Sequence, residues 1–161
     1  MSSDASMAPS SSSPTVLSRD EGEVIRLGAV TIFVKEDGSR TRGTLGLAEF
    51  RGKGFRIPPH AHGAHDETLY LLEGELNITL GGETFGLKAG DALTFPLDVA
   101  HTTWHDGDSE ARFLVQVSPA RALDYFRDLG VALGAAAREG RPPAPDDFRP
   151  VMQRYGYKPG F

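Results

Sequence analysis

Histidine is concentrated in two short segments of the 161-residue chain. Three of its five histidines lie in PPHAHGAHDETLYLLEGEL, which begins at Pro58 and also holds Glu67, and the other two lie in AGDALTFPLDVAHTTWH, which ends at His105. The chain has no cysteine, which excludes disulfides and thiolate metal sites. Imidazole and carboxylate are the remaining side-chain donors for a divalent transition metal, and these two segments are rich in both.

His60 and His62 form a His-x-His pair. In a β-strand the side chains of residues i and i+2 point to the same face, so the two imidazoles would lie side by side. Two histidines without partners would be costly on a buried face. Pro58 and Pro59 interrupt ladder pairing just before them, as expected where a strand enters an irregular rim. A His-x-His pair alone is more often a surface pair than a metal site.

Glu67 follows the four-residue link GAHD and begins the run ETLYLL. On a strand Glu67 would share a face with Leu69 and Leu71, which are candidate core residues. A carboxylate on such a face needs a partner, and a divalent cation would supply one. His101 would add an imidazole from a distant strand and complete a shell of three imidazoles and one carboxylate.

Short apolar runs alternate with glycine-rich turns up to Pro119, and this pattern favours an all-β sandwich or barrel. In LNITL, for example, Leu76, Ile78 and Leu80 alternate with polar residues, as in a strand with one buried face. The expected strands are the runs VIRLG, VTIFVKE, TLGLAEFR, FRIPPHAH, ETLYLL, LNITL, TFGLKAGDALTFP, AHTTWH and ARFLVQV.

The pattern becomes helical after Pro119, where Leu123, Phe126 and Leu129 recur at helical spacing. The segment RPPAPDD interrupts it, and a second short helix is expected to start at Asp146 or Asp147 and to stop at Gly156. We therefore expect three parts, with one or two helices packed outside the β domain and the three apolar residues buried against it. The expected parts are a disordered tail over residues 1–14, a β-barrel over 15–119 and a helical extension over 120–161.

Composition excludes several classes of partner. The formal net charge is −5 and no basic run occurs, so neither nucleic acid nor an anionic membrane is an expected partner. No window approaches the ~20 apolar residues of a membrane-spanning helix. The first residues, MSSDASMAPSSSSPT, lack the basic and apolar parts of a secretory signal. These features predict a cytoplasmic protein.

Two segments together resemble the paired motifs of the cupin superfamily. The first motif is glycine, five residues, His-x-His, three or four residues, glutamate, six residues and glycine. It is matched without a gap by Gly54, His60, His62, Glu67 and Gly74. The second motif is matched by Gly90, Pro96 and His101, whereas Asp98 replaces a glycine and His105 replaces an asparagine. The flanking segments are similar to those of small cupins of the quercetin 2,3-dioxygenase type.

The resemblance implies a β-barrel of jelly-roll type that binds one divalent ion. Its implied ligands are His60, His62, Glu67 and His101. Three imidazoles and one carboxylate suit Fe, Mn, Co, Ni or Zn, and the affinity order does not choose among them. Cupins commonly pair through their outer strands, so the resemblance also implies a homodimer.

Three functions are compatible with such a site. The first, which the resemblance favours, is a dioxygenase that cleaves a phenolic or enolic aromatic such as a flavonol, with Glu67 as the catalytic proton acceptor and dioxygen as co-substrate. The second is a non-redox cyclase or isomerase of polyketide type, in which the metal acts as a Lewis acid. The third is a small-molecule binding module, against which an intact four-ligand shell argues.

Less specific expectations hold for Phe113 and for the remaining aromatic and histidine residues of the two segments. Phe95, Trp104 and Phe113 are candidates for the lining of a substrate pocket, although core packing is at least as good an interpretation for the two phenylalanines. His105 is expected beside the metal ligands or at the surface, because HDGDS suggests that the strand ends there. His65 is not used by the motif and is expected at the rim or in solvent.

Overall fold

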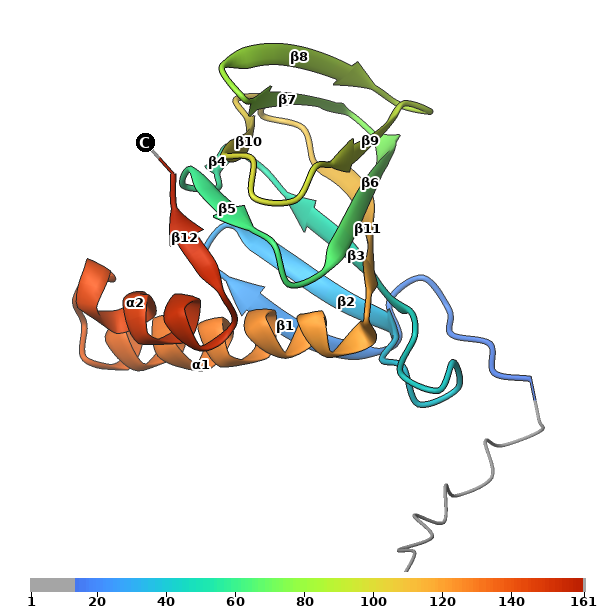
Figure 1. Ribbon diagram of the computed structural model, residues 1–161, viewed down its shortest axis with the longest axis horizontal. Coiled ribbons are helices and arrows are strands. Elements are labelled where there is room, and N and C mark those ends of the chain that lie inside the picture. The colour runs from blue at the N-terminus through green and yellow to red at the C-terminus, as the bar shows by residue number, and fades with distance from the viewer. Residues whose placement is uncertain (1–13, 161) are drawn as a thin grey trace, which may run out of the picture.

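The computed structural model describes residues 14–160 and consists of two antiparallel β-sheets with two helices against one of them (Figure 1). The first six-stranded sheet has the order β1 (Glu23–Leu27), β2 (Val30–Glu36), β3 (Gly46–Gly52), β11 (Ala111–Ser118), β6 (Asp66–Glu73) and β9 (Ala92–Phe95). The second has the order β12 (Tyr157–Pro159), β5 (His60–His62), β10 (His101–His105), β7 (Glu75–Leu80) and β8 (Glu83–Lys88), and β4 (Phe55–Arg56) also pairs with β10.

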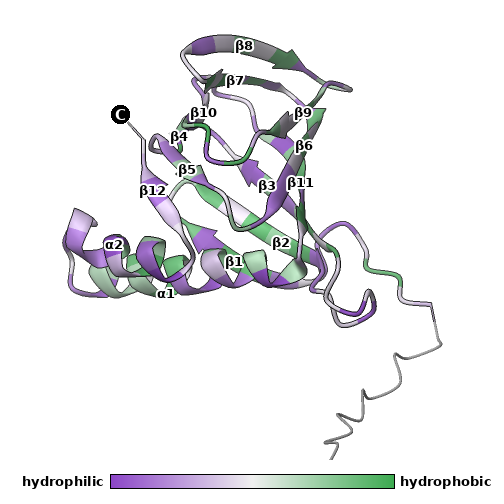
Figure 2. Cartoon of the chain, in the orientation of Figure 1, coloured by the Kyte–Doolittle hydropathy of each residue, from purple (hydrophilic) through white to green (hydrophobic). Residues whose placement is uncertain are grey.

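The main hydrophobic core lies between the two sheets. This core results from the alternation of apolar and polar residues along the strands. Figure 2 shows the same alternation as hydrophobic residues interleaved with hydrophilic ones. On β7 the side chains of Leu76 and Ile78 are fully buried, and on β6 Leu69 and Leu71 are buried on the same face. The predicted all-β jelly roll with C-terminal helices is confirmed, and the predicted strand-length runs correspond to β1–β11.

The turn between β6 and β7 requires glycine. Gly74 has a φ of +82°, and a Cβ added there would lie 3.1 Å from the Cα atom of Ala111. A side chain would therefore meet both a strained backbone and the neighbouring strand. This tight turn lets β6 and β7 leave toward different sheets while β6 stays paired with β11.

The predicted helices are α1 (Leu123–Arg138), which follows a short 3₁₀ turn at Ala120–Ala122, and α2 (Pro145–Arg154). The helix α2 begins at Pro145, just before Asp146 and Asp147, the two predicted starts. Asp147 lies in its first turn, where the carboxylate accepts a hydrogen bond from the Ala144 N–H at 2.7 Å. This contact satisfies one of the free N–H groups at the helix start. Gly156, with a φ of +72°, follows the last turn as predicted.

The three apolar residues predicted to bury α1 against the barrel are not equally buried. Leu123 is fully buried, and a Cβ on Gly46 would lie only 2.9 Å from its Cδ1 atom. Phe126 and Leu129 are partly buried, and both line a cavity. Phe126 also packs against Phe50 of the core, with ring centroids 5.3 Å apart. The expectation that all three residues are buried is therefore confirmed for Leu123 and met only in part by Phe126 and Leu129.

The C-terminal extension also returns to the barrel. After α2 the chain forms β12, in which Tyr157 pairs with His62 and Pro159 with His60 (Figure 1). This strand was not expected from the sequence, because three residues that end in proline carry no periodic signal. Proline is tolerated there since β12 is an edge strand.

Residues 1–13 lie outside the described part of the chain. They make up all of the expected N-terminal tail except Pro14. Within residues 14–160, neither helix has the length and apolar character needed to span a membrane.

Candidate metal centre and cavity

Strand pairing brings three imidazoles together. His60 and His62 lie on β5, and the antiparallel register of β5 and β10 places His101 opposite His60. The ring centroids of His60 and His101 are 4.4 Å apart, and those of His62 and His101 are 4.9 Å apart. One ring nitrogen from each of the three histidines lies within 4.8 Å of the others.

Backbone carbonyls orient two of these rings. The Nδ1 atom of His60 is 2.8 Å from the Pro58 carbonyl oxygen, and that of His101 is 2.9 Å from the Val99 carbonyl oxygen. A carbonyl oxygen only accepts, so each Nδ1 carries the proton and each Nε2 keeps a free lone pair. In metal-binding histidines, the ring nitrogen that does not bind the metal typically donates a hydrogen bond in this way.

Buried nitrogens without hydrogen-bond partners mark the same place. Within the described residues these atoms are Nδ1 and Nε2 of His62 and Nε2 of His101. Leaving such groups without partners costs free energy, roughly 1–3 kcal/mol each. A divalent cation would satisfy the Nε2 lone pairs, so the residues present fit a metal ion.

Glu67 lies beside these histidines at the start of β6, where the structure groups its donor atom with those of His62 and His65 and not with those of His60 and His101. Its Oε2 atom is 3.2 Å from His62 Nε2, without the alignment of a hydrogen bond, and 3.3 Å from His65 Nε2. Burial would raise the pKa of Glu67, but its contacts with His62 and His65 outweigh burial and hold that pKa well below its usual range. The carboxylate is therefore ionised at neutral pH, which is the form that binds a metal ion.

The neighbouring imidazoles stay neutral. Burial lowers the pKa of His60 and lowers that of His101 to about 4. Neutral imidazole is the form that binds metal, so desolvation prepares both rings for a cation. We call His60, His62, Glu67 and His101 the imidazole cluster. It is the set of four ligands implied by the sequence motifs.

His65 does not lie at the rim, as the sequence analysis expected. It is only 5% exposed, and its ring stacks on that of His62 with centroids 4.2 Å apart and planes 16° apart. His62, His65 and Glu67 form a second group whose donor atoms all lie within 4.8 Å. The link after β5 turns inward, a feature that strand parity cannot reveal.

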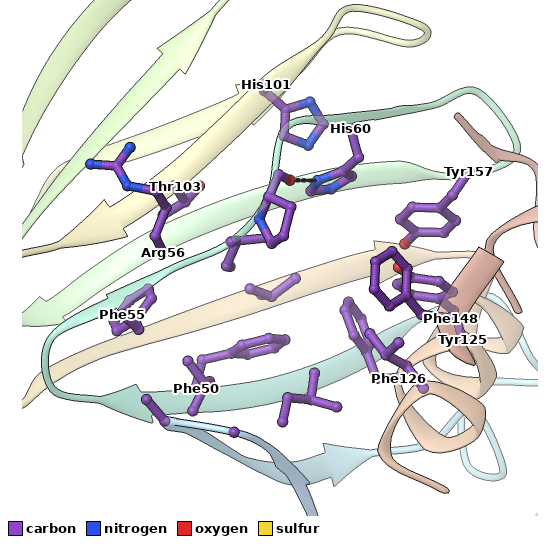
Figure 3. A pocket seen from close by; sticks show the side chains of 18 of the residues that line it. Phe50, Phe55, Arg56, His60, His101, Thr103, Tyr125, Phe126, Phe148 and Tyr157 are labelled. Carbon is purple, nitrogen blue, oxygen red and sulfur yellow. Dashed lines mark hydrogen bonds between the residues drawn. The ribbon is translucent and has the colours of Figure 1, made fainter. Parts of the chain in front are cut away.

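A cavity of about 460 Å³ opens above the imidazole cluster and reaches both sheets and both helices (Figure 3). His60, Glu67 and His101 line it at one end, and most of its other residues are apolar. Phe95 and Phe113 line the cavity as the sequence analysis suggested, and both also belong to the buried core.

The other two pocket candidates, Trp104 and His105, do not line this cavity, so their expected positions were wrong. Trp104 occupies the opposite face of β10 from His101, where the Arg56 guanidinium stacks 4.5 Å above its ring. The strand runs through His105, which is buried beside Phe55, and its Nε2 atom is 2.9 Å from the Ser109 carbonyl oxygen. His105 therefore holds the loop after β10 and does not contact the imidazole cluster.

Sequence reasoning missed one whole side of the cavity. We call it the C-terminal wall; it consists of Tyr125, Phe126, Phe148, Met152 and Tyr157. Tyr157 packs against three imidazoles, with ring centroids 5.6 Å from His60, 5.2 Å from His62 and 5.6 Å from His65. Only the aromatic content of the extension hinted at this wall, and no motif distinguishes cavity-lining aromatics from core ones.

Comparisons with known proteins agree with this architecture. Residues 46–117 match the family model described as Cupin domain. The chain is 43% identical over 79 residues to "Polyketide synthase CurC" of Streptomyces cyaneus, a match that covers 49% of this chain and 51% of that protein. It is 31% identical over 123 residues to "Quercetin 2,3-dioxygenase" of Bacillus subtilis (strain 168), covering 76% of this chain and 36% of that protein.

The fold is also found among solved structures. The polyketide cyclase RemF from Streptomyces resistomycificus superimposes with a TM-score of 0.58 at 19% identity, covering 70% of this chain and 94% of that one. The matches to CurC and to the dioxygenase span about half and about a third of those relatives. On its two sheets, its motif residues and these matches, the chain belongs to the cupin superfamily.

Proposed function

We propose that this chain is a metal-dependent enzyme that acts on a phenolic or enolic aromatic substrate of polyketide type. One observation carries the proposal: an apolar, aromatic-lined cavity of about 460 Å³ ends at the imidazole cluster. Cavities that bind small organic ligands have this size and pair apolar walls with a few polar groups. The walls suit planar rings, and the polar end suits a substrate oxygen.

The chain's own residues would act in distinct ways. His60, His62, His101 and Glu67 would hold one divalent ion, which when bound supplies Lewis-acid polarisation of a substrate oxygen. The Pro58 and Val99 carbonyls keep two of the imidazoles turned toward it. The apolar lining excludes water and strengthens electrostatic interactions at the polar end of the cavity.

For the reaction class we favour non-redox proton transfer and ring closure. The support is the 43% identity to CurC, a protein named as a polyketide synthase component. Such chemistry needs a polarised carbonyl and a cavity that holds a flexible substrate in one conformation. The low pKa of Glu67 argues against this carboxylate as the base, so in this proposal its role is to hold the metal.

Dioxygenation of a flavonol-like substrate is the second candidate. It is favoured by the similarity to quercetin 2,3-dioxygenase, which extends over 76% of this chain. Both candidates use the same cavity and the same metal ligands. They differ in whether dioxygen is consumed.

The deciding experiment compares turnover with and without air. Protein loaded with Fe, Mn, Co, Ni or Zn is incubated with flavonols and with aromatic 1,3-diketones, while absorbance and oxygen uptake are followed. Conversion of a diketone that proceeds equally under anaerobic conditions, and stops when a chelator removes the metal, supports the proposal. Oxygen uptake coupled to loss of flavonol absorbance would replace it with the second candidate. Equal turnover by metal-free protein would contradict both.

A further inference from the structure

Two phenol groups lie next to the imidazole cluster with no part in holding a metal. Tyr125 comes from α1 and Tyr157 from β12, and their rings stack with centroids 3.7 Å apart and planes 11° apart. Both line the cavity. Figure 3 shows their hydroxyl oxygens close together and turned toward the same side of the cavity. The stacking fixes the two hydroxyls as a pair.

Both side chains are more than nine-tenths buried, since Tyr125 is 8% exposed and Tyr157 is 4% exposed. Within residues 14–160 no protein group forms a hydrogen bond with the Tyr125 hydroxyl, whose oxygen is accessible from the cavity. The Tyr157 hydroxyl has a single long contact of 3.4 Å with His65 Nε2. Buried phenol hydroxyls normally have partners. Two neighbouring phenols that lack good partners therefore indicate a binding site.

The contact with His65 leaves the proton of Tyr157 free. The same His65 Nε2 atom lies 3.3 Å from Glu67 Oε2. An ionised carboxylate only accepts hydrogen bonds, so this Nε2 carries a proton and donates it to Glu67. A protonated nitrogen cannot accept a hydrogen bond from Tyr157. The Tyr157 hydroxyl is then available to donate to a molecule in the cavity.

We propose that the hydroxyls of Tyr125 and Tyr157 form an oxygen-binding subsite, which donates two hydrogen bonds to a carbonyl or phenolate oxygen of a planar aromatic ligand. The subsite deepens the proposed function, on which the identity of the natural substrate still rests. It places a second substrate oxygen beside the imidazole cluster, because the Tyr157 hydroxyl and Glu67 both contact His65. Burial and the nearby Glu67 charge raise the pKa of Tyr125 to about 12, which keeps it a donor.

The test compares two probes that differ only in the acceptor oxygen, 9-fluorenone and fluorene. Their dissociation constants are measured by equilibrium dialysis with zinc-loaded protein, and the ratio of the two constants is the readout. Tyr125→Phe and Tyr157→Phe keep the stacked rings and remove the hydroxyls. Each single change should shift the ratio about threefold against fluorenone, and the double variant about tenfold. Fluorene affinity and zinc content should not change.

Tyr155→Phe is the matched control. Its hydroxyl donates to Asp128 at 2.8 Å, away from the cavity, so the probe ratio should equal that of the wild type. A ratio that stays unchanged in the double variant would overturn the subsite, because the ketone oxygen would then sit on zinc or another group. Failure of the wild type to bind either probe would also overturn it. Loss of the proposed turnover with the probe ratio intact would instead refute the reaction and leave the subsite standing.

Discussion

The imidazole cluster and the C-terminal wall face each other across one cavity, but different interactions position them. The cluster draws its histidines from the neighbouring strands β5 and β10 and its glutamate from the start of β6 in the other sheet, and backbone carbonyls and antiparallel register hold its rings. The wall is held by stacked aromatics and by helix packing, with Tyr125 and Tyr157 at its centre. The cluster is a polar centre built on the barrel, whereas the wall shapes the space above it.

This difference suggests that chemistry and substrate choice are separable in this protein. Changes in the cluster should alter metal binding and leave the cavity shape largely intact. Changes in the wall should alter ligand binding and stability while the metal is retained. Tyr157 is the exception, because it belongs to the wall and also packs against two imidazoles of the cluster and against His65.

The largest effect is expected for His62→Ala. His62 is 1% exposed and is common to both groups of donor atoms. Its loss should weaken metal binding by at least about 100-fold, since changes to the outer partners of metal ligands alone cost 10–100-fold. Metal content measured by mass spectrometry, with circular dichroism for the fold, tests this. His105→Ala is the control and should keep its metal. Full metal content in His62→Ala would remove this residue from the site.

Packing of α1 should give the next largest effect. Leu123→Ala should lower the free energy of unfolding by roughly 2–5 kcal/mol, because this side chain fills a closed core position. Leu129→Ala should cost less, roughly 1–2 kcal/mol, since Leu129 is partly buried and borders the cavity. Urea denaturation of both variants measures the difference. Equal losses would show that the cavity is closed around Leu129 in solution.

Tyr157→Ala should show that a change in the C-terminal wall can alter metal binding at the imidazole cluster. Removing the ring exposes three imidazoles and should weaken metal binding about tenfold, as for other residues that support metal ligands. Tyr157→Phe keeps the ring and should bind metal as the wild type does. Competition with a chromophoric chelator gives both affinities. Wild-type affinity in Tyr157→Ala would mean that β12 does not support the cluster.

A small effect is expected for Lys158→Ala. Lys158 Nζ lies 3.0 Å from Asp98 Oδ1, but the two side chains are 68% and 57% exposed. Exposed ion pairs contribute about 0–1 kcal/mol, so the melting temperature should change little. A large drop would show that this ion pair, more than the aromatic packing of Tyr157, holds β12 on β5.

Strand parity predicted how His60, His62 and Glu67 face, whereas His101 was joined to them by its place in the second cupin motif. His60 and His62 share a face by their spacing, and Glu67 shares a face with Leu69 and Leu71, as the structure shows. Asp98, which stands where the cupin motif has glycine, still adopts a φ of +59°, so the turn before His101 is preserved. Asp is one of the few residues that tolerate this conformation.

The remaining features depend on tertiary contacts that no local pattern records. His65 lies in a link, and its burial depends on the turn after β5 and on contact with Tyr157. Tyr125 and Tyr157 are more than 30 residues apart and meet only because β12 returns to β5. The helices themselves were predictable from Leu123 and its helical repeat. Their place beside a cavity was not, because the same spacing fits a packed core.

The most direct test of the account is a titration of metal-free protein with Co(II), followed by visible absorption and X-ray absorption spectroscopy. We expect one equivalent per chain, with three imidazole nitrogens and at least one carboxylate oxygen among the ligands. We also expect the tight site to disappear in His101→Ala and to remain in His105→Ala. Absence of a tight site, or a tight site unchanged by His101→Ala, would contradict the assignment of the imidazole cluster as a metal centre.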